Sequence, residues 1–274
     1  MNLAFYGKGG IGKSTIASNI SINFSLRGKS VMQIGCDPKH DSTLLLLEDN
    51  QEPITVIQSM EQEIPEDRII LTGKHGVKCV EIGGPQPGLG CAGRGIIAGL
   101  GMLEQMDGFA GQNYDCVVYD ILGDVVCGGF FEPLKKKKVD QMYIVTSGEF
   151  NSLFAANNLC RGYCNCRLKE RGVVLAGIIA NCRGIPKEEQ IVKNFCDAVG
   201  VPLVALLPRD NRIEACTISC TPIADCYPDS DLMKILDQIC DYIESVRHPL
   251  EYPRPMTLDE LRGLFKKVVS ERDE

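Results

Sequence analysis

The sequence predicts an α/β fold in which a mostly parallel β-sheet is flanked by helices. Three observations predict it: short apolar runs recur along the chain, segments with helical periodicity lie between them, and a glycine-rich loop follows the first run. This alternation is typical of βαβ units, in which helices cover strands that are buried on both faces. The 274 residues, 44% of them hydrophobic, fit one compact domain.

The expected strands are short and strongly apolar. In chain order they are Leu3–Tyr6, Val31–Ile34, Val117–Tyr119, Tyr143–Val145, Val173–Ile179 and Leu203–Leu207. The helices expected between them are Ser14–Arg27, which Gly28 ends, Phe154–Arg171 and Glu188–Val199.

The last part of the chain is set apart by prolines between Pro249 and Pro255. Thr257 and Glu260 have the spacing of a capping box, so a helix is expected to begin there. We therefore divide the chain into a main domain, residues 1–248, and a proline-rich linker with a helical tail, residues 249–274.

Composition argues against several classes of protein. A net charge of -7 disfavours electrostatic binding to the phosphate backbone of nucleic acids, so no nucleic-acid partner is expected. No stretch approaches the roughly 20 apolar residues of a membrane span, and the glycine loop begins too soon after Met1 for a signal peptide, which predicts a cytoplasmic protein without a membrane partner. Fourteen cysteines in such a chain indicate thiols and metal rather than disulfides, and suggest an anaerobe.

A nucleotide-binding motif lies between the first expected strand and helix. The pattern G-x-x-x-x-G-K-[ST] is formed by Gly7, Lys8, Gly9, Gly10, Ile11, Gly12, Lys13 and Ser14, with Thr15 next to them. Backbone N–H groups of such a loop surround a phosphate, Lys13 would reach the β and γ phosphates, and the Ser14 hydroxyl would ligate Mg²⁺. The motif therefore predicts that the main domain is a P-loop NTPase domain.

Four carboxylates are expected near the same triphosphate. Asp120 ends an apolar run, from which it can hold Mg²⁺ through water, and Asp124 follows it; Asp37 and Asp41 come after the second strand. A single aspartate at a strand end is commonly a cap or turn former. Only the combination with the P-loop favours a role at the nucleotide.

Two cysteines lie in glycine-rich surroundings that a buried structural cysteine rarely needs. These are Cys91, between Gly83 and Gly95, and Cys127, before Gly128 and Gly129. Iron–sulfur clusters commonly take four thiolates, and glycines expose backbone N–H groups that can point at the sulfides.

With these motifs the chain resembles, over residues 1 to about 220, the nitrogenase iron protein and its relatives, the ATP-driven reductases of tetrapyrrole synthesis. The resemblance implies one [4Fe-4S] cluster shared by a homodimer, with Cys91 and Cys127 from each subunit. It also implies a ferredoxin- or flavodoxin-type donor, MgATP hydrolysis, and a nitrogenase or nitrogenase-like catalytic partner. Residues 1–248 would then be a P-loop ATPase and iron–sulfur domain.

The resemblance also implies roles for single residues. Lys8 would reach the other subunit's nucleotide, Asp124 would activate the hydrolytic water, and Arg94 would contact the partner and, in some systems, carry ADP-ribose. Asp37 and Asp41 would form one nucleotide-sensing switch, with Lys39 between them, and Asp120 to Cys127 a second one that joins phosphate to cluster. The nucleotide, its base above all, would be bound by Asn181, Pro208, Arg209 and Asp210. The candidate catalytic residues are Lys8, Lys13, Asp37 and Asp124.

The final substrate stays open at this point. Arg94 after Cys91 resembles nitrogenase iron proteins, whereas His40 resembles the tetrapyrrole reductases, such as the one that serves reductive cyclisation of nickel-sirohydrochlorin a,c-diamide. The tail after Arg254 is also shorter than in many nitrogenase iron proteins. A ParA/Min-type partitioning ATPase, the alternative of another class, would share Lys8 and Lys13 but have no cluster.

The remaining cysteines, lysines and histidines have plainer interpretations. Cys160, Cys164 and Cys166, and a looser group of Cys216, Cys220 and Cys226, are favoured as packing residues, although a second metal site is conceivable. The run Lys135–Lys138 is interpreted as a solvated face. His40, His75 and His248 are isolated from one another in the sequence, which gives a histidine metal site no support.

Overall fold

The computed structural model describes residues 1–60, 64–84, 91–123, 129–136, 138–246 and 251–270, with side chains through residue 266. An eight-stranded sheet forms the centre of this described part, in the order β3-β4-β2-β5-β1-β6-β7-β8. All neighbours pair in parallel except β3 and β4. The predicted α/β fold with a mostly parallel sheet is therefore confirmed.

The strands are β1 Asn2–Gly7, β2 Val31–Cys36, β3 Leu71–Thr72, β4 Lys78–Glu81, β5 Cys116–Leu122, β6 Gln141–Thr146, β7 Val174–Asn181 and β8 Leu203–Leu207. The described helices are α1 Lys13–Leu26, α2 Val56–Ser59, α3 Glu66–Ile69, α4 Ala92–Leu103, α5 Asp107–Ala110, α6 Glu132–Lys135, α7 Phe150–Asn165, α8 Glu188–Val199, α9 Asn211–Ile218, α10 Ile223–Cys226, α11 Asp231–Ser245 and α12 Leu258–Ser270. Short 3₁₀ turns lie at Lys74–Gly76 and Lys169–Arg171.

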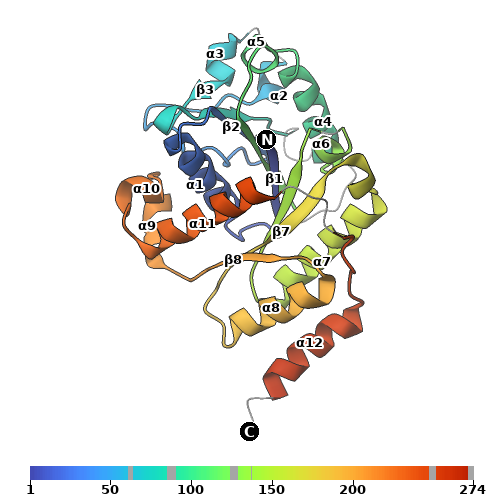
Figure 1. The fold of residues 1–274 in the computed structure, drawn as a ribbon. Coiled ribbons are helices and arrows are strands. Elements are labelled where there is room, and N and C mark those ends of the chain that lie inside the picture. Colours follow the sequence, from blue (N-terminus) through green and yellow to red (C-terminus); the bar gives the residue numbers. More distant parts are fainter. Residues whose placement is uncertain (61–63, 85–90, 124–128, 137, 247–250, 271–274) are drawn as a thin grey trace.

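Helices cover both faces of the sheet, as Figure 1 shows: α1 and α9 to α11 lie on one side, and α4, α6 and α7 on the other. Each face has its own apolar core, because alternate residues of a strand point to opposite faces. Phe5 packs with α1 and α11 in one core, while Tyr6 packs with α4 and α7 in the other. The middle strands β1, β2 and β6 are buried along almost their whole length.

One predicted helix has the wrong bounds. The segment expected to be helical from Phe154 to Arg171 forms α7, which begins at Phe150 and ends at Asn165. The chain leaves the helix because Arg167 adopts a left-handed backbone with φ 49°. A 3₁₀ turn and Gly172, with φ 84°, then lead into β7. Apolar periodicity continued past the helix end because Leu168, beyond the turn, is also fully buried.

The capping box predicted for the tail is present at the start of α12. Thr257 N–H donates to the Glu260 carboxylate at 2.7 Å, and Glu260 N–H donates to the Thr257 hydroxyl at 3.2 Å. α12 packs on α8 and α7, with Phe265 tilted against Phe150 at 5.3 Å between ring centroids. The predicted boundary between residues 248 and 249 lies outside the described residues and stays a prediction.

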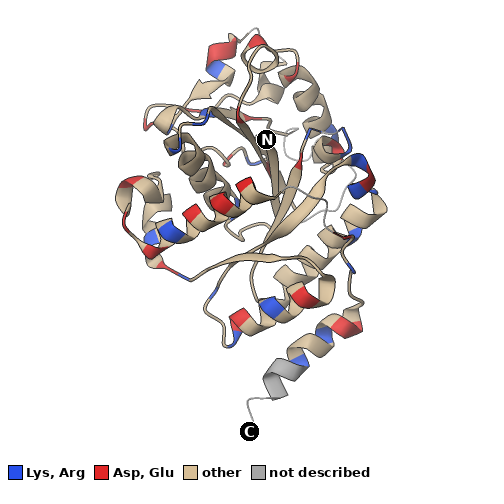
Figure 2. Ribbon diagram, in the orientation of Figure 1, with Lys and Arg blue, Asp and Glu red and all other residues tan. Residues whose placement is uncertain are grey.

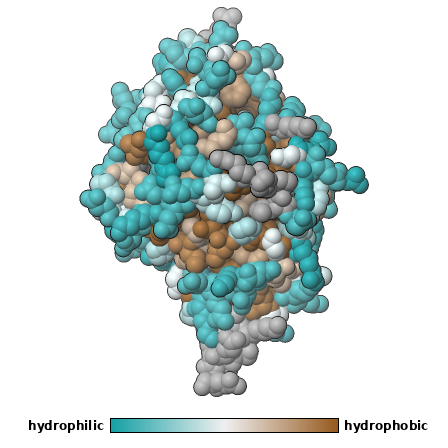
Figure 3. Space-filling model, viewed as in Figure 1, coloured by the Kyte–Doolittle hydropathy of each residue, from teal (hydrophilic) through white to brown (hydrophobic). Residues whose placement is uncertain are grey.

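The surface of the described part is of mixed polarity. Lys and Arg are interspersed with Asp and Glu among uncharged residues, mainly on helices and loops (Figure 2). Figure 3 shows an apolar area over the edge strand β8, four of whose five residues are only partly buried. No described helix has the length and apolar character that crossing a bilayer requires.

Candidate functional site

The P-loop lies at the carboxyl end of β1, between β5 and β6. Gly10 and Gly12 adopt left-handed backbones with φ 72° and 91°, and Ile11 N–H donates to Lys8 O at 3.1 Å, so the loop closes on itself. α1 begins at Lys13, and no described side chain caps its first turn. The free N–H groups of such a helix end, together with its positive dipole, make an anion site.

Lys13, the first residue of α1, is paired with a buried carboxylate of a neighbouring strand. It is 5% exposed and forms an ion pair with Asp120 of β5, which is fully buried. Burial disfavours the charged ammonium, but the attraction and hydrogen bond of Asp120 outweigh it, and the pKa of Lys13 is raised. Asp120 Oδ2 accepts no hydrogen bond from any described residue. A buried carboxylate oxygen without a donor fits a Mg²⁺ ion with its water ligands.

A pocket of about 410 Å³ opens beside these residues. It brings together most of the predicted nucleotide and switch residues, namely Lys8, Gly9, Gly10, Gly12, Lys13, Ser14, Thr15, Asp37, Lys39 and Asp41. The wall opposite the P-loop is the segment after β2, where the Asp37 side chain accepts from Lys39 N–H at 3.0 Å. Gly7 ends β1 and Ile11 is buried beneath the loop.

The residues predicted around the base lie behind the P-loop rather than in this pocket. Asn181 Nδ2 donates to Ile11 O at 2.7 Å, and a side chain at Gly12 would overlap that amide, so Asn181 supports the loop from below. Asp210 caps α9 by accepting from Arg212 N–H at 2.8 Å, and its pKa is lowered by the bond with Arg212. Pro208 stands between β8 and Arg209.

Arg183 was not predicted as a site residue. Its guanidinium donates to Gly10 O at 2.5 Å, and its own carbonyl accepts from Arg209 at 3.4 Å. It therefore joins the P-loop to the segment after β8. In the sequence, this residue is only an arginine two positions after Asn181. Its contact with the P-loop depends on β7 lying two strands from β1, which the sequence does not display.

Glu188 holds the same region in place and was also missed. Glu188 is 6% exposed, and its carboxylate accepts from the N–H groups of Arg183, Gly184 and Ile185 at 2.8 to 3.2 Å and from that of Gly148 at 2.9 Å. A buried carboxylate needs such donors. Glu188 thereby fixes the loop that carries Arg183.

Glu81, a third missed residue, ends β4 behind the Asp37–Asp41 segment. It is fully buried, and Oε1 accepts from both the N–H and the hydroxyl of Thr43 at 2.7 Å. Burial raises the pKa of Glu81 to about 8 against the opposing bonds from Thr43, and the Asp120 charge adds to the rise. Gly35 lies between Glu81 and Asp120 in the sheet register, and only glycine leaves room for the Glu81 carboxyl.

Cys91 is exposed and stands at the N-cap of α4. Arg94 and Gly95 donate their N–H groups to Cys91 O at 3.0 and 3.2 Å, and Arg94 is exposed on the first turn. A thiol at a helix N-terminus is favoured as thiolate, the form that binds iron. Cys91 therefore fits a cluster ligand.

The other predicted cluster ligand, Cys127, and the predicted catalytic Asp124 lie outside the described residues. Their flanks are described. A Cβ on Gly129 would come within 2.6 Å of Gly93 Cα, so the backbone two residues after Cys127 touches the backbone two residues after Cys91. The structure thus brings the chain around both predicted ligands together at one edge of the sheet.

Most other described cysteines are packing residues. Seven are buried, and burial raises the pKa of thiols such as Cys79 and Cys116 to about 12, which keeps them protonated. No group of three or more metal-binding side chains occurs within the described ranges. Cys164, part of the predicted helical trio, lies 3.4 Å from Pro253 O, where it packs against the tail.

Comparison with known proteins gives a family and curated relatives. The family model described as 4Fe-4S iron sulfur cluster binding proteins, NifH/frxC family, matches residues 1–270. A nitrogenase iron protein of Methanospirillum hungatei is 42% identical over 272 residues, covering 97% of this chain and 95% of that protein. Nitrogenase iron protein 2 of Methanobacterium ivanovii is 40% identical over 264 residues, 96% of this chain and 97% of the relative.

Solved structures share the fold at low identity. The cell division ATPase MinD of Pyrococcus furiosus has a TM-score of 0.68 at 18% identity and covers 90% of this chain and 99% of its own. A ParA family ATPase from Chlorobium tepidum has a TM-score of 0.64 at 19% identity, with 87% and 96% covered. These likenesses concern the fold alone, and they confirm its P-loop architecture.

Proposed function

Because the chain belongs to the NifH/frxC family of 4Fe-4S cluster-binding proteins, we propose that it carries electrons one at a time to a nitrogenase-like catalytic partner. The family confirms the predicted class, an ATP-dependent iron–sulfur reductase component, and its predicted cofactors, a 4Fe-4S cluster and MgATP. The donor we propose is a ferredoxin- or flavodoxin-type protein. We propose a cytoplasmic location, because a protein that uses MgATP and a reduced iron–sulfur cluster needs the nucleotide and the reducing conditions of the cytoplasm.

The observation that carries the proposal is the backbone contact of Gly93 with Gly129 beside the exposed Cys91. We propose that Cys91 and Cys127 supply two thiolates, half of what a 4Fe-4S cluster commonly takes. A homodimer would supply the other two, so that one cluster bridges two subunits. Arg94, exposed next to Cys91, would face the catalytic partner and is the candidate for ADP-ribosylation.

At the nucleotide site, we propose that Lys13 and Asp120 change partners when MgATP binds. Lys13 would leave Asp120 to bind the β and γ phosphates, and Asp120 would then orient Mg²⁺ through water while Ser14 ligates it. MgATP supplies the free energy of hydrolysis when bound. Asp37, Lys39 and Asp41 face the P-loop across the pocket and would respond to the γ phosphate. We further propose Asp124 as the base for the attacking water.

The choice of final substrate rests on the relatives. Those reported above are named nitrogenase iron protein, which favours a nitrogenase-type partner and nitrogen fixation over tetrapyrrole reduction. His40, the residue that resembles the tetrapyrrole reductases, is exposed beside the pocket with φ 46°. Electron delivery to dinitrogen-reducing and tetrapyrrole-reducing partners, measured side by side with MgATP, decides between the two.

The cluster assignment is tested by cysteine substitution. We expect about four iron atoms per dimer in the wild type, and none after Cys91→Ser or Cys127→Ser, with the fold retained. Cys226→Ser is the matched control, since Cys226 is also exposed but lies on α10. Iron analysis with electron paramagnetic resonance of the reduced protein reads the result. Iron retained in both the Cys91 and Cys127 variants would contradict the assignment, and a wild type without iron would favour the ParA/Min-type alternative.

A further inference from the structure

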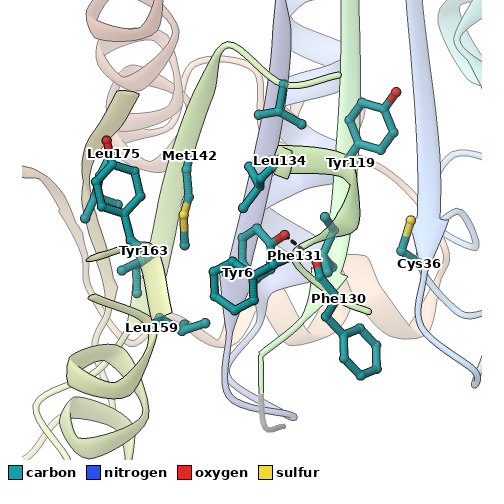
Figure 4. Packing of buried hydrophobic residues seen from close by; sticks show 14 of the residues in the cluster. Tyr6, Cys36, Tyr119, Phe130, Phe131, Leu134, Met142, Leu159, Tyr163 and Leu175 are labelled. Atoms are coloured by element: carbon teal, nitrogen blue, oxygen red, sulfur yellow. Dashed lines mark hydrogen bonds between the residues drawn. The ribbon is translucent and has the colours of Figure 1, made fainter. Parts of the chain in front are cut away.

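We propose that Tyr6 is a positioning residue that links the P-loop to the chain beside the cluster. Its hydroxyl donates to the carbonyl of Phe130 at 2.6 Å, in the fully buried core (Figure 4). The inference rests on the proposed function, because it concerns how the nucleotide state reaches the cluster.

Tyr6 is next to the P-loop on a strand that has little freedom to move. It precedes Gly7, the last residue of β1, and pairs in register with Ile121 of β5 and Ile144 of β6. Pairing on both sides makes β1 rigid, so Tyr6 and Gly7 keep a fixed position relative to the start of the P-loop.

Phe130 stands three positions after Cys127 and one after Gly129, where the described chain resumes. The Tyr6 ring stacks on Phe131, with 5.6 Å between centroids and 23° between planes, while its hydroxyl holds the Phe130 carbonyl. Burial, with smaller contributions from Cys36 and Cys166, raises the pKa of Tyr6 well above its usual value. The hydroxyl therefore keeps its proton and remains a donor.

The neighbouring residue holds the other flank of the same segment. Gly123 N–H donates to Gly7 O at 3.0 Å, and a Cβ on Gly123 would lie within 2.6 Å of Gly7 N and O. The chain before residue 124 and the chain after residue 128 are thus attached to the consecutive residues Gly7 and Tyr6. Gly129 in turn touches Gly93 of α4, which follows Cys91. One rigid pair beside the nucleotide site therefore fixes both flanks of the segment that contains Cys127.

Apolar packing alone does not require this hydroxyl, because phenylalanine has nearly the same volume and stacking surface. The chain contains a matched case in the same core: Tyr163 Oη donates to Val173 O, also at 2.6 Å. That carbonyl precedes β7, far along the chain from either predicted cluster cysteine. Tyr163→Phe is therefore the control for Tyr6→Phe.

The experiment compares both variants with the wild type as cluster-loaded dimers. MgATP is expected to accelerate removal of iron by a chelator in the wild type, since linked sites respond to each other. In Tyr6→Phe we expect this acceleration to fall by about fivefold or more, the lower range of coupling between sites, with MgATP affinity unchanged. Tyr163→Phe should keep the full acceleration. The electron paramagnetic resonance line shape of the reduced cluster should lose its MgATP response only in Tyr6→Phe.

Each outcome decides. Full acceleration in Tyr6→Phe, or an equal loss in both variants, overturns the role of Tyr6. A wild type that holds no cluster overturns the proposed function, and the inference with it. If Tyr6→Phe does not fold, hydrogen exchange of the wild-type chain gives the answer: MgATP should change the exchange of the peptide that carries Phe130 and Phe131, and an unchanged rate overturns the proposal.

Discussion

Lys13 and Asp120 show how the nucleotide site keeps two opposite charges buried before a ligand arrives. Removing one partner of a buried ion pair leaves the other charge unpaired, which costs about 3–5 kcal/mol. The exposed Lys39 at the pocket rim forms no ion pair with any residue that the structure describes, so its removal leaves no buried charge unpaired. The two lysines should therefore differ in stability as well as in binding.

We expect Lys13→Ala to lower the free energy of unfolding by about 3 kcal/mol without nucleotide, because Asp120 is left buried and charged. Its MgATP affinity should fall roughly 10- to 100-fold, the equivalent of a lost charged hydrogen bond. Lys39→Ala should change stability by less than about 0.5 kcal/mol. Urea unfolding and calorimetric titration measure both quantities. Equal stability of the two variants would contradict a buried pair.

Glu81 should make stability depend on pH. Its pKa in the folded chain, about 8, lies above the ordinary value of 4.5, so the folded state binds its proton more tightly than the unfolded state does. The contribution of Glu81 to the free energy of unfolding is therefore fully present below pH 4.5. It decreases as the pH rises from 4.5 to 8. Glu81→Gln imitates the protonated form and should remove that loss, so the stability of wild type relative to the variant should fall from pH 6 to 8, by at most about 1.4 kcal/mol per pH unit. Nucleotide-free denaturation at several pH values measures it, and parallel curves would contradict it.

At the scale of elements, α4 depends on where its glycines lie. Gly99 faces Ile82, the residue after β4, and a Cβ there would come within 2.6 Å of Ile82 Cγ2, whereas nothing lies within 4 Å of a Cβ at Gly101. We expect Gly99→Ala to destabilise the protein by about 1–3 kcal/mol through overpacking. Gly101→Ala should stabilise it by up to about 1 kcal/mol, since alanine favours the helix. Thermal melting of both variants tests the pair, and a shift of the same sign in both would contradict this packing.

The glycines of α4 also explain why the sequence did not predict this helix. Glycine disfavours helices, so the glycine-rich surroundings of Cys91 do not indicate one, although Ile96, Leu100 and Leu103 have helical spacing. The central strands were predictable because strands buried on both faces are continuous apolar runs. β4 was not, since Lys78 and Glu81 interrupt its four residues. α11 was overlooked despite the cap Ser230 and a regular apolar stripe.

Some residues of the candidate site could be predicted from the sequence and others could not. The P-loop and Cys91 are local patterns, and a sequence displays local patterns directly. Glu81, Arg183 and Tyr6 act across strands, and their partners become neighbours only through the strand order β4-β2-β5-β1 and the position of β7. A one-dimensional pattern does not contain that order, so these residues could not be found before the fold.

At the scale of the whole molecule, one subunit brings its nucleotide pocket and Cys91, which we propose as a cluster ligand, to the carboxyl end of the same sheet. Two subunits that share a cluster would bring their P-loops toward each other. Lys8 lines the nucleotide pocket and is only partly buried, so it is available to a second subunit. Lys13, paired within its own subunit, is not. The two P-loop lysines should therefore separate binding from closure of the dimer.

We expect Lys8→Ala to bind MgATP with nearly wild-type affinity but to remain in the open dimer, because the phosphates of one subunit lose their contact from the other. Small-angle scattering should show that the radius of gyration falls with MgATP in the wild type and not in the variant. MgATP-dependent electron transfer should fall with it, since a ligand shifts an equilibrium only through different contacts in the two states. Lys234→Ala, which removes an exposed lysine of α11, is the control and should close normally. Normal closure and electron transfer in Lys8→Ala would contradict the role of this lysine between subunits.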